Sequence, residues 1–374
     1  GEADDLEGKG EGEEDEKVER GEDDEESAVR WAWLARVLPD FSGEKELCAI
    51  DGVTAAFGSL FPTQLVACLL AIELGFDAWQ KKGLRASLME IVSRTAVSSS
   101  VCYVIFSAVE DRTFLREFQI PVAASDALRE FKAIYMFEAI VLGLLSGFFG
   151  LLGVLLLGIF QKLGTMVHDG INWIGTEKLG LMENVLGTIV TPALGGAIAG
   201  LIYKSTPLLF ADGEDQMRVI VGFSAELGTG AIAAAGLLKL VCTGLCLGFG
   251  FVGGQFMPFL FAGTCLGAVA HLTVDDVPLL IAVPCCMAAL PCAFMPLIFT
   301  FTVIASVSFS LGGVGTTPVF LACVVSHTVV AGFGIVQRIV LGASPSEAME
   351  RTDESAVRRR FDVLAAMSAW KGGD

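Results

Sequence analysis

The sequence predicts an all-α polytopic membrane protein whose helices are broken and tilted. Hydrophobic residues make up 53% of its 374 residues, and the mean hydropathy is +0.64. A soluble domain rarely carries so much apolar surface. The apolar residues come in runs close to the roughly 20 residues that a bilayer-spanning helix needs. Glycine, with 43 residues, occurs inside these runs, where it lets helices approach closely in lipid. We therefore expect a multi-pass integral membrane protein.

Charge and polarity divide the chain into four predicted segments. The first 26 residues hold fifteen acidic residues against three basic ones, and so carry most of the net charge of −18. Such a block cannot bury a core, whereas the rest of the chain is only mildly acidic and offers no surface for nucleic acid. The predicted segments are an acidic disordered tail (1–26), an interfacial amphipathic segment (27–51), a membrane domain (52–341) and a polar C-terminal tail (342–374).

The membrane domain is expected to contain eight apolar segments. In chain order they are Gly52–Gly75, Ile91–Val109, Phe131–Leu163, Val185–Tyr203, Gly228–Leu247, Gln255–Leu272, Val277–Phe309 and Thr317–Leu341. Phe131–Leu163 is long enough for one tilted span or a broken pair of helices. Val277–Phe309 is interrupted by three prolines, and we expect the phenylalanine and tryptophan stripes to face lipid. Irregular backbone at membrane depth is tolerated only inside protein or along a cavity, so these interruptions predict an internal site.

Several kinds of chemistry have no support in the sequence. The ten cysteines are scattered through apolar runs without paired spacing or a neighbouring histidine, so we expect neither a disulfide framework nor a metal site. We find no nucleophile with an adjacent base, no metal cluster and no phosphate-binding loop. The sequence therefore predicts a protein that is not an enzyme and that needs no cofactor.

The most informative stretch is Gly248–Gly267, GFGFVGGQFMPFLFAGTCLG. Its first half contains four glycines, including Gly253 and Gly254, which prevent a continuous helix. Pro258 follows at the start of the next apolar run, and proline is favoured in a first helical turn because its missing N–H is not needed there. We therefore expect a helix to begin near Gln255, preceded by open backbone.

The start of that helix suits an anion. The N–H groups of Gln255, Phe256 and Met257 would have no partner within the helix, and the helix dipole adds partial positive charge at this end. Residues 240–270 contain no basic side chain, so an ion bound there would be held reversibly, as conduction requires. A glycine-rich packing motif between helices fits the same residues, and the chemistry alone does not separate the two interpretations.

The stretch Gly253–Pro258, GGQFMP, resembles the GxFxP motif of the CLC chloride channel and transporter family. The likeness extends over about thirty residues. It includes Lys239 inside an apolar helix, the glycine-rich break, and a following helix with Gly263 and Gly267. By this resemblance, the amides of Gln255 and Phe256 face the anion.

Three further stretches resemble the same family, so that the likeness covers roughly residues 40–341. Ala55–Leu74 is similar to the helix with the pattern AAF…PLxGxLFxxE, and it ends in Glu73. Asn184–Leu201 is similar to a glycine-rich middle helix, and Cys292–Ser306 to a later APL…E helix. The resemblance implies the CLC-type inverted-repeat channel fold, N-terminally incomplete here, and a homodimer with one pore per subunit. It also implies transport of chloride or a similar small anion.

The departures from the family bear on mechanism. The GSGxP and GxEGP segments, which carry an ion-contacting serine and a gating glutamate, are absent. In family exchangers a second glutamate, which takes protons, follows the position of Glu73. Leu74 stands there in this chain and cannot carry a proton, which favours a passive channel. We expect Glu73 to be a structural acid that bonds to backbone at a helix end, with a functional role as the alternative.

Two other functions remain open on the sequence. The missing serine and glutamate segments, and the missing tyrosine that the family carries late in the chain, favour a non-conducting or truncated CLC-like membrane scaffold. A secondary transporter of another small anion, such as nitrate or fluoride, is the third possibility. Anion flux in liposomes separates the three.

Overall fold

The computed structural model describes residues 45–61, 64–82, 88–110, 120, 132–179, 185–209, 213–251, 253–274 and 276–332. The two predicted tails, most of the predicted interfacial segment and residues 333–341 lie outside the described residues. The contacts within the chain divide it into two units, Gly1–Val53 and Thr54–Asp374. The first described helix, Lys45–Leu60, crosses this boundary.

The described residues form helices and contain no strand, which confirms the predicted all-α class. In chain order they are α2 (Lys45–Leu60), α3 (Gln64–Lys82), α4 (Leu88–Glu110), α5 (Ile134–Leu179), α6 (Val185–Ser205), η3 (Pro207–Leu209), α7 (Glu214–Gly222), α8 (Ser224–Leu227), α9 (Thr229–Gly248), α10 (Phe256–Thr273), α11 (Leu279–Cys292), α12 (Ile298–Ser308) and α13 (Gly312–Gly332).

Five of the described helices are long and apolar enough to cross a membrane, namely α5, α6, α9, α10 and α13. This confirms the predicted multi-pass membrane protein. Apolar stretches of α3 and α4, and the helices α11 and α12, are shorter than a full span. Short apolar helices that are buried among longer ones are the broken elements that the internal prolines and glycines predict.

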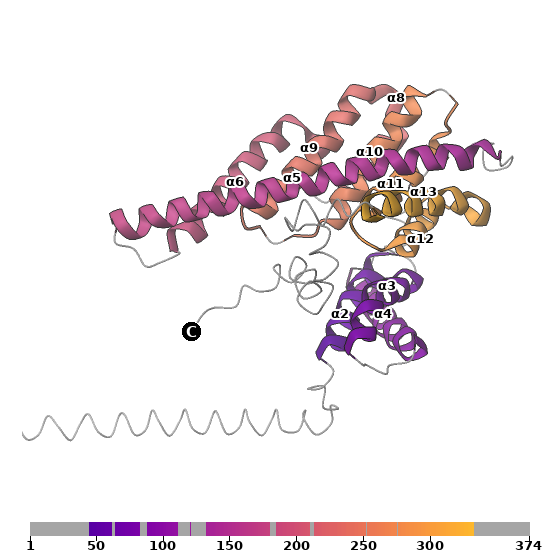
Figure 1. Ribbon diagram of the computed structural model, residues 1–374, viewed down its shortest axis with the longest axis horizontal. Helices are drawn as coiled ribbons and strands as arrows, with labels where there is room; N and C mark the ends of the chain where they lie inside the picture. Colours follow the sequence, from indigo (N-terminus) through magenta and orange to yellow (C-terminus); the bar gives the residue numbers. More distant parts are fainter. Residues whose placement is uncertain are drawn as a thin grey trace, which may run out of the picture. The chain divides into compact units, whose positions relative to one another are not determined.

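The longest helix, α5, is a single unbroken helix (Figure 1) and not a broken pair. Its 46 residues contain no proline, and at 1.5 Å per residue they extend for about 69 Å. That is more than twice the hydrocarbon thickness of a bilayer, about 30 Å. The apolar run that ends at Leu163 therefore continues as helix for a further four turns or so.

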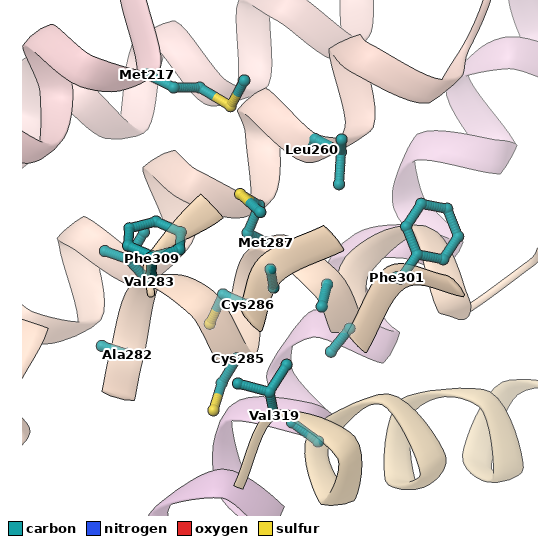
Figure 2. Close-up of a cluster of buried hydrophobic side chains, with 14 of the residues drawn as sticks. Met217, Leu260, Ala282, Val283, Cys285, Cys286, Met287, Phe301, Phe309 and Val319 are labelled. Atoms are coloured by element: carbon teal, nitrogen blue, oxygen red, sulfur yellow. The ribbon is translucent and has the colours of Figure 1, made fainter. Parts of the chain in front are cut away.

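Helix α11 lies at the centre of the core. Every residue from Leu280 to Cys292 is buried, and the helix packs against α10, α13, α5 and α12. Figure 2 shows Cys285, Cys286 and Met287 of this helix among side chains from its neighbours. Pro284 and Pro291 lie inside α11 and do not interrupt it. The interruption of the predicted Val277–Phe309 segment falls at residues 293–297.

The expectation that aromatic side chains face lipid was wrong for the middle of the chain. Phe259, Phe261 and Phe301 are fully buried, whereas Phe137 and Phe148 of α5 are exposed. The buried rings belong to α10 and to the buried face of α12, which pack against other helices. Composition alone does not distinguish a helix inside such a bundle from one at its surface, because both are apolar all round.

Candidate functional site

The site begins where α9 ends, in a turn that only a glycine allows at low cost. Gly250 has a φ of +93°, in the left-handed region. Its N–H donates to the carbonyl of Leu247 at 3.3 Å, and the N–H of Phe251 donates to that of Cys246 at 3.0 Å. These two bonds form a Schellman motif, which ends a helix and satisfies its last carbonyls. The glycine-rich sequence thus stops α9 before the next helix starts.

Two phenylalanines anchor this turn to α6. Phe249 is buried and packs against Ala199 and Leu245. A Cβ on Gly195 would lie 2.5 Å from the Cβ of Phe249, and one on Gly196 would lie 3.1 Å from the ring of Phe251. The paired glycines of α6 therefore leave the space that the turn occupies, so the backbone leading into α10 is held from one side.

Helix α10 begins at Phe256 with Gln255 as its N-cap residue, which confirms the predicted start. The side chain of Gln255 does not cap it. Counting from the start of the helix, the first N–H that has an acceptor is that of Phe259, which donates to the carbonyl of Gln255 at 3.2 Å. Pro258 has no N–H, and the N–H groups of Gln255, Phe256 and Met257 have no acceptor among the described residues. Within the described part of the chain, this helix start therefore presents three amides without an acceptor, which we call the free amides.

The space beside the two glycines is open. A Cβ added to Gly253 or Gly254 would meet no atom within 4 Å, and Gly254 is exposed. Gln255, Phe256, Met257 and Pro258 are half-buried. The structure therefore brings all six residues predicted for the site to one helix start, with free space beside the glycines.

Close backbone packing holds α10 in place. A Cβ on Gly263 would lie 2.5 Å from the carbonyl oxygen of Cys286, and one on Gly267 would lie 2.5 Å from the Cα of Val283. These two glycines, spaced four apart, let α10 lie directly against α11. The packing interpretation therefore holds for Gly263 and Gly267, whereas the helix start at Gly253 and Gly254 is a separate part of the segment.

Three aromatic rings back the ring of Phe256. It stacks on Phe301 of α12, with ring centroids 4.9 Å apart and an interplanar angle of 22°. Phe57 of α2 meets it edge-on at 5.0 Å, and Phe61 lies 5.7 Å away. We call Phe57, Phe61, Phe256 and Phe301 the ring cluster. It fixes the side chain of a residue whose own N–H is one of the free amides.

Glu73 lies in the middle of α3 and not at a helix end as expected, because α3 continues to Lys82, and it binds the start of α12. Its carboxylate accepts the N–H of Phe299 at 2.7 Å and the N–H of Thr300 at 2.9 Å, together with the hydroxyl of Thr300. Helix α12 has no cap from its own N-cap residue, so a side chain 226 residues earlier in the chain supplies one. The carboxylate and the positive end of the helix dipole attract each other.

The end of α11 is capped in the same external way. Pro296 has no N–H, so the carbonyl of Cys292 has no donor four residues ahead. His327 of α13 donates from Nδ1 to that carbonyl at 3.0 Å, and Ser326 donates to the carbonyl of Ala289 at 2.7 Å. Side chains of the protein therefore satisfy both ends of the break between α11 and α12.

Lys239 is the one charged side chain among the described residues that are buried. Its Nζ donates to the carbonyl of Leu209 at 2.9 Å and lies 5.4 Å from the centre of the Phe261 ring. Lys239 thus joins α9 to η3 and to α10, and its ammonium group donates to a carbonyl of η3. Lys239 lies immediately before residues 240–270, the range in which the sequence contains no basic side chain.

Together, the fold and this helix start define a class: a polytopic α-helical membrane protein with an uncapped helix N-terminus between its packed helices. The chain belongs to the voltage gated chloride channel family, whose pattern matches residues 27–331. This confirms the family resemblance of the GGQFMP segment and the CLC-type class of the fold.

Curated relatives match a shorter part of the chain. It is 31% identical over 111 residues to the "Putative ion-transport protein YfeO" of Salmonella newport. The proteins of the same name from Salmonella agona and Salmonella enteritidis match equally well. The match covers 29% of this chain and 27% of each relative, about a quarter of their length.

Sequence reasoning found the amides but missed the residues that support them. Phe57, Phe61 and Phe301 lie in two stretches that resemble family motifs, AAFGSLF and PLIFTF. Their repeated phenylalanines were the available signal. The partner of Glu73 had no signal, because nothing in the sequence connects it to Thr300.

Proposed function

We propose that this protein carries chloride or a similar small anion passively across a lipid bilayer, and that the start of α10 binds the ion. Gly253, Gly254, Gln255, Phe256, Met257 and Pro258 form the proposed anion-binding segment. A small anion that enters an apolar bundle loses its hydration, which is costly unless other dipoles replace the water. Three free amides and the helix dipole offer that replacement without a full positive charge.

One observation carries the proposal: α10 begins without a cap among the described residues, inside a protein of a chloride channel family. Backbone groups at membrane depth are normally paired, because an unpaired polar group in hydrocarbon costs several kcal/mol. A helix start left open in such a place is expected to have a ligand. The names of the relatives, as ion-transport proteins, support the same general function.

The proposed transport is passive. Leu74 occupies the position after Glu73, where family exchangers carry a proton-transferring glutamate. We propose that Glu73 itself is a structural acid that holds the start of α12, in keeping with its three hydrogen bonds there. Movement of chloride is then expected without coupled movement of protons.

We also propose a homodimer with one pathway in each subunit, as the family resemblance implies. Mass photometry of the protein in detergent micelles would give the mass of two chains plus micelle. A uniform mass of one chain plus micelle contradicts the dimer and leaves the site unaffected.

The function is tested by chloride efflux from liposomes that contain the purified protein. A chloride electrode and a pH electrode record the same sample, and a potassium ionophore removes the electrical limit. We expect chloride efflux above that of protein-free liposomes, with no proton movement opposed to it. Chloride efflux with a fixed ratio of protons would contradict the passive mechanism.

Two variants at Gln255 test whether chloride binding depends on the free amides. Gln255→Pro removes one of the three N–H groups at a position whose φ of −88° is close to that of proline. Gln255→Ala removes the side chain but keeps the N–H. We expect Gln255→Pro to weaken chloride binding severalfold and Gln255→Ala to leave it nearly unchanged. Well-folded protein with no flux of any anion would favour the scaffold, and flux of nitrate or fluoride alone would favour the other transporter.

A further inference from the structure

Glu73 and the free amides of α10 are joined by a short series of contacts. The carboxylate holds the N–H groups of Phe299 and Thr300 and the hydroxyl of Thr300. The next residue along α12 is Phe301, whose ring stacks on that of Phe256 at 4.9 Å. Phe256 contributes one of the free amides at the start of α10. Only one side chain, that of Phe301, therefore separates the Glu73 cap from the proposed site.

The middle of this series has little room to move. Thr300 and Phe301 are fully buried, and the N–H of Phe301 donates to the carbonyl of Leu297 at 3.0 Å. Phe57 and Phe61 contact the ring of Phe256 on other sides. Packed aromatic rings favour particular offsets and angles, so a shift of Phe301 changes the favoured position of Phe256. The ring and the amide of Phe256 share one Cα, so the direction of the N–H follows.

The start of α12 depends on Glu73 to stay where it is. The helix has no cap of its own, and a five-residue break precedes it. Carboxylate bonds to N–H groups at a helix start are charge-assisted and among the stronger hydrogen bonds in proteins. Without the carboxylate, two amides and a buried hydroxyl lose their acceptor, and the first turn is expected to shift or fray to find another.

We propose that Glu73 is a positioning residue for the anion site at the start of α10. It holds Thr300, and thereby sets the ring of Phe301 against the ring of Phe256 and the direction of the Phe256 amide. Glu73 does not contact the ion. This inference rests on the proposed function, because it assigns Glu73 a part in anion binding in addition to its capping of α12.

A cap that only stabilises the fold behaves differently from a positioning residue. Loss of a purely stabilising bond lowers the amount of folded protein, which reduces the maximal flux and leaves the KM for chloride unchanged. Loss of a positioning residue raises the KM of the protein that remains folded. The effect must also pass through Phe301, so it must depend on whether that ring is present.

The test is a double-mutant cycle between Glu73→Gln and Phe301→Ala, with the KM for chloride measured in the liposome assay. Gln has the size of Glu but lacks the charge and one acceptor. We expect Glu73→Gln to raise the KM about threefold to tenfold, the range that corresponds to about 0.7–1.4 kcal/mol. In the Phe301→Ala background the same change is expected to raise it less than 1.5-fold. Glu226→Gln, an exposed acid on α8, is the matched control and is expected to leave the KM unchanged.

Thr300→Val and Thr300→Ser provide a second route if Glu73→Gln does not fold. Valine removes the hydroxyl that donates to Glu73, and serine keeps it. We expect Thr300→Val to raise the KM about twofold and Thr300→Ser to restore it. Equal KM values for Glu73→Gln and the parent protein, or equal effects of Glu73→Gln with and without the Phe301 ring, would overturn the inference.

The cycle separates this inference from the proposed function. If the parent protein shows saturable chloride flux and Glu73→Gln leaves its KM unchanged, the inference fails and the proposed function stands. If folded parent protein shows neither flux nor chloride binding by calorimetry, both fail together.

Discussion

Two helices of this protein begin in similar ways and differ in what occupies their first turn. Helices α10 and α12 both follow a break in an apolar stretch, both have a proline close to the start, and neither is capped by its own N-cap residue. At α12 the carboxylate of Glu73 accepts two of the first amides. At α10 the corresponding amides have no acceptor among the described residues.

The same physical property acts at both helix starts, with different results. A helix start attracts negative charge because its amides are unpaired and its dipole is positive there. At α12 the chain supplies the anion itself, in the form of a tethered carboxylate, and the helix is fixed to α3. At α10 the described residues supply none, and we propose that the same attraction binds an ion from outside.

The largest expected effect is on the start of α12, which Glu73 caps. Glu73→Ala leaves two amides and the hydroxyl of Thr300 without their acceptor. We expect the free energy of unfolding to fall by about 3 kcal/mol, because the loss of a charged partner leaves its donors unsatisfied. Equilibrium unfolding in mixed detergent micelles measures this. Glu226→Ala, which removes an exposed acid, should cost less than about 0.5 kcal/mol, and equal losses would contradict the cap.

The next effect concerns how α10 is held without such a cap. Gly263→Ala would place a Cβ 2.5 Å from the carbonyl oxygen of Cys286 and 2.7 Å from the Cα of Met287. Both atoms belong to the backbone of α11, so the helices must separate. We expect a loss of about 2 kcal/mol in the free energy of unfolding. Gly230→Ala in α9 meets nothing within 4 Å and should be neutral or slightly stabilising. A stable Gly263→Ala protein would show that backbone packing does not hold α10.

A carboxylate introduced at the start of α10 should make this helix start resemble that of α12. Gln255→Glu keeps the size of the side chain and adds a negative charge beside the three free amides. We expect chloride affinity, measured by calorimetry, to fall at least tenfold, because like charges a few ångströms apart repel by more than about 1.4 kcal/mol in a protein interior. Gln255→Ala is the neutral control. Unchanged affinity in Gln255→Glu would place the ion elsewhere.

The smallest effect is expected from one hydroxyl. Thr300→Val removes the donor to Glu73 but keeps the volume of the side chain and both backbone bonds. We expect the free energy of unfolding to fall by about 1 kcal/mol, the usual net contribution of one hydrogen bond. Thr300→Ser keeps the hydroxyl and should lose less. A loss as large as that of Glu73→Ala would mean that the backbone bonds contribute little.

The two helix starts also show how far the sequence predicts this protein. Gly253, Gly254 and Pro258 lie within six residues of each other, and their local effects on the backbone were enough to predict where α10 begins. The cap of α12 depends on Glu73, 226 residues away from its partner, and no local rule connects them. The stack of Phe301 on Phe256 was unpredictable for the same reason.

The sequence also did not predict which prolines interrupt a helix. Proline and glycine indicate where a helix can break, but tertiary packing decides whether it does. Pro284 and Pro291 lie inside α11, where neighbouring helices cover every residue from Leu280 to Cys292. The break after α11 contains Pro296, and side chains from α3 and α13 pair with the groups that the break leaves free. The composition around these prolines is nearly the same in both places.

The central claim is that a backbone amide at the start of α10 binds the anion, and one measurement tests it most directly. Replacing Phe256 by its α-hydroxy analogue converts its peptide bond to an ester, which removes the N–H and keeps the ring that Phe301 stacks on. Calorimetry then gives the chloride affinity against protein with phenylalanine introduced by the same route. We predict an affinity about tenfold lower, the value of one charge-assisted hydrogen bond. An ester protein that binds chloride as tightly as the phenylalanine protein would contradict the claim.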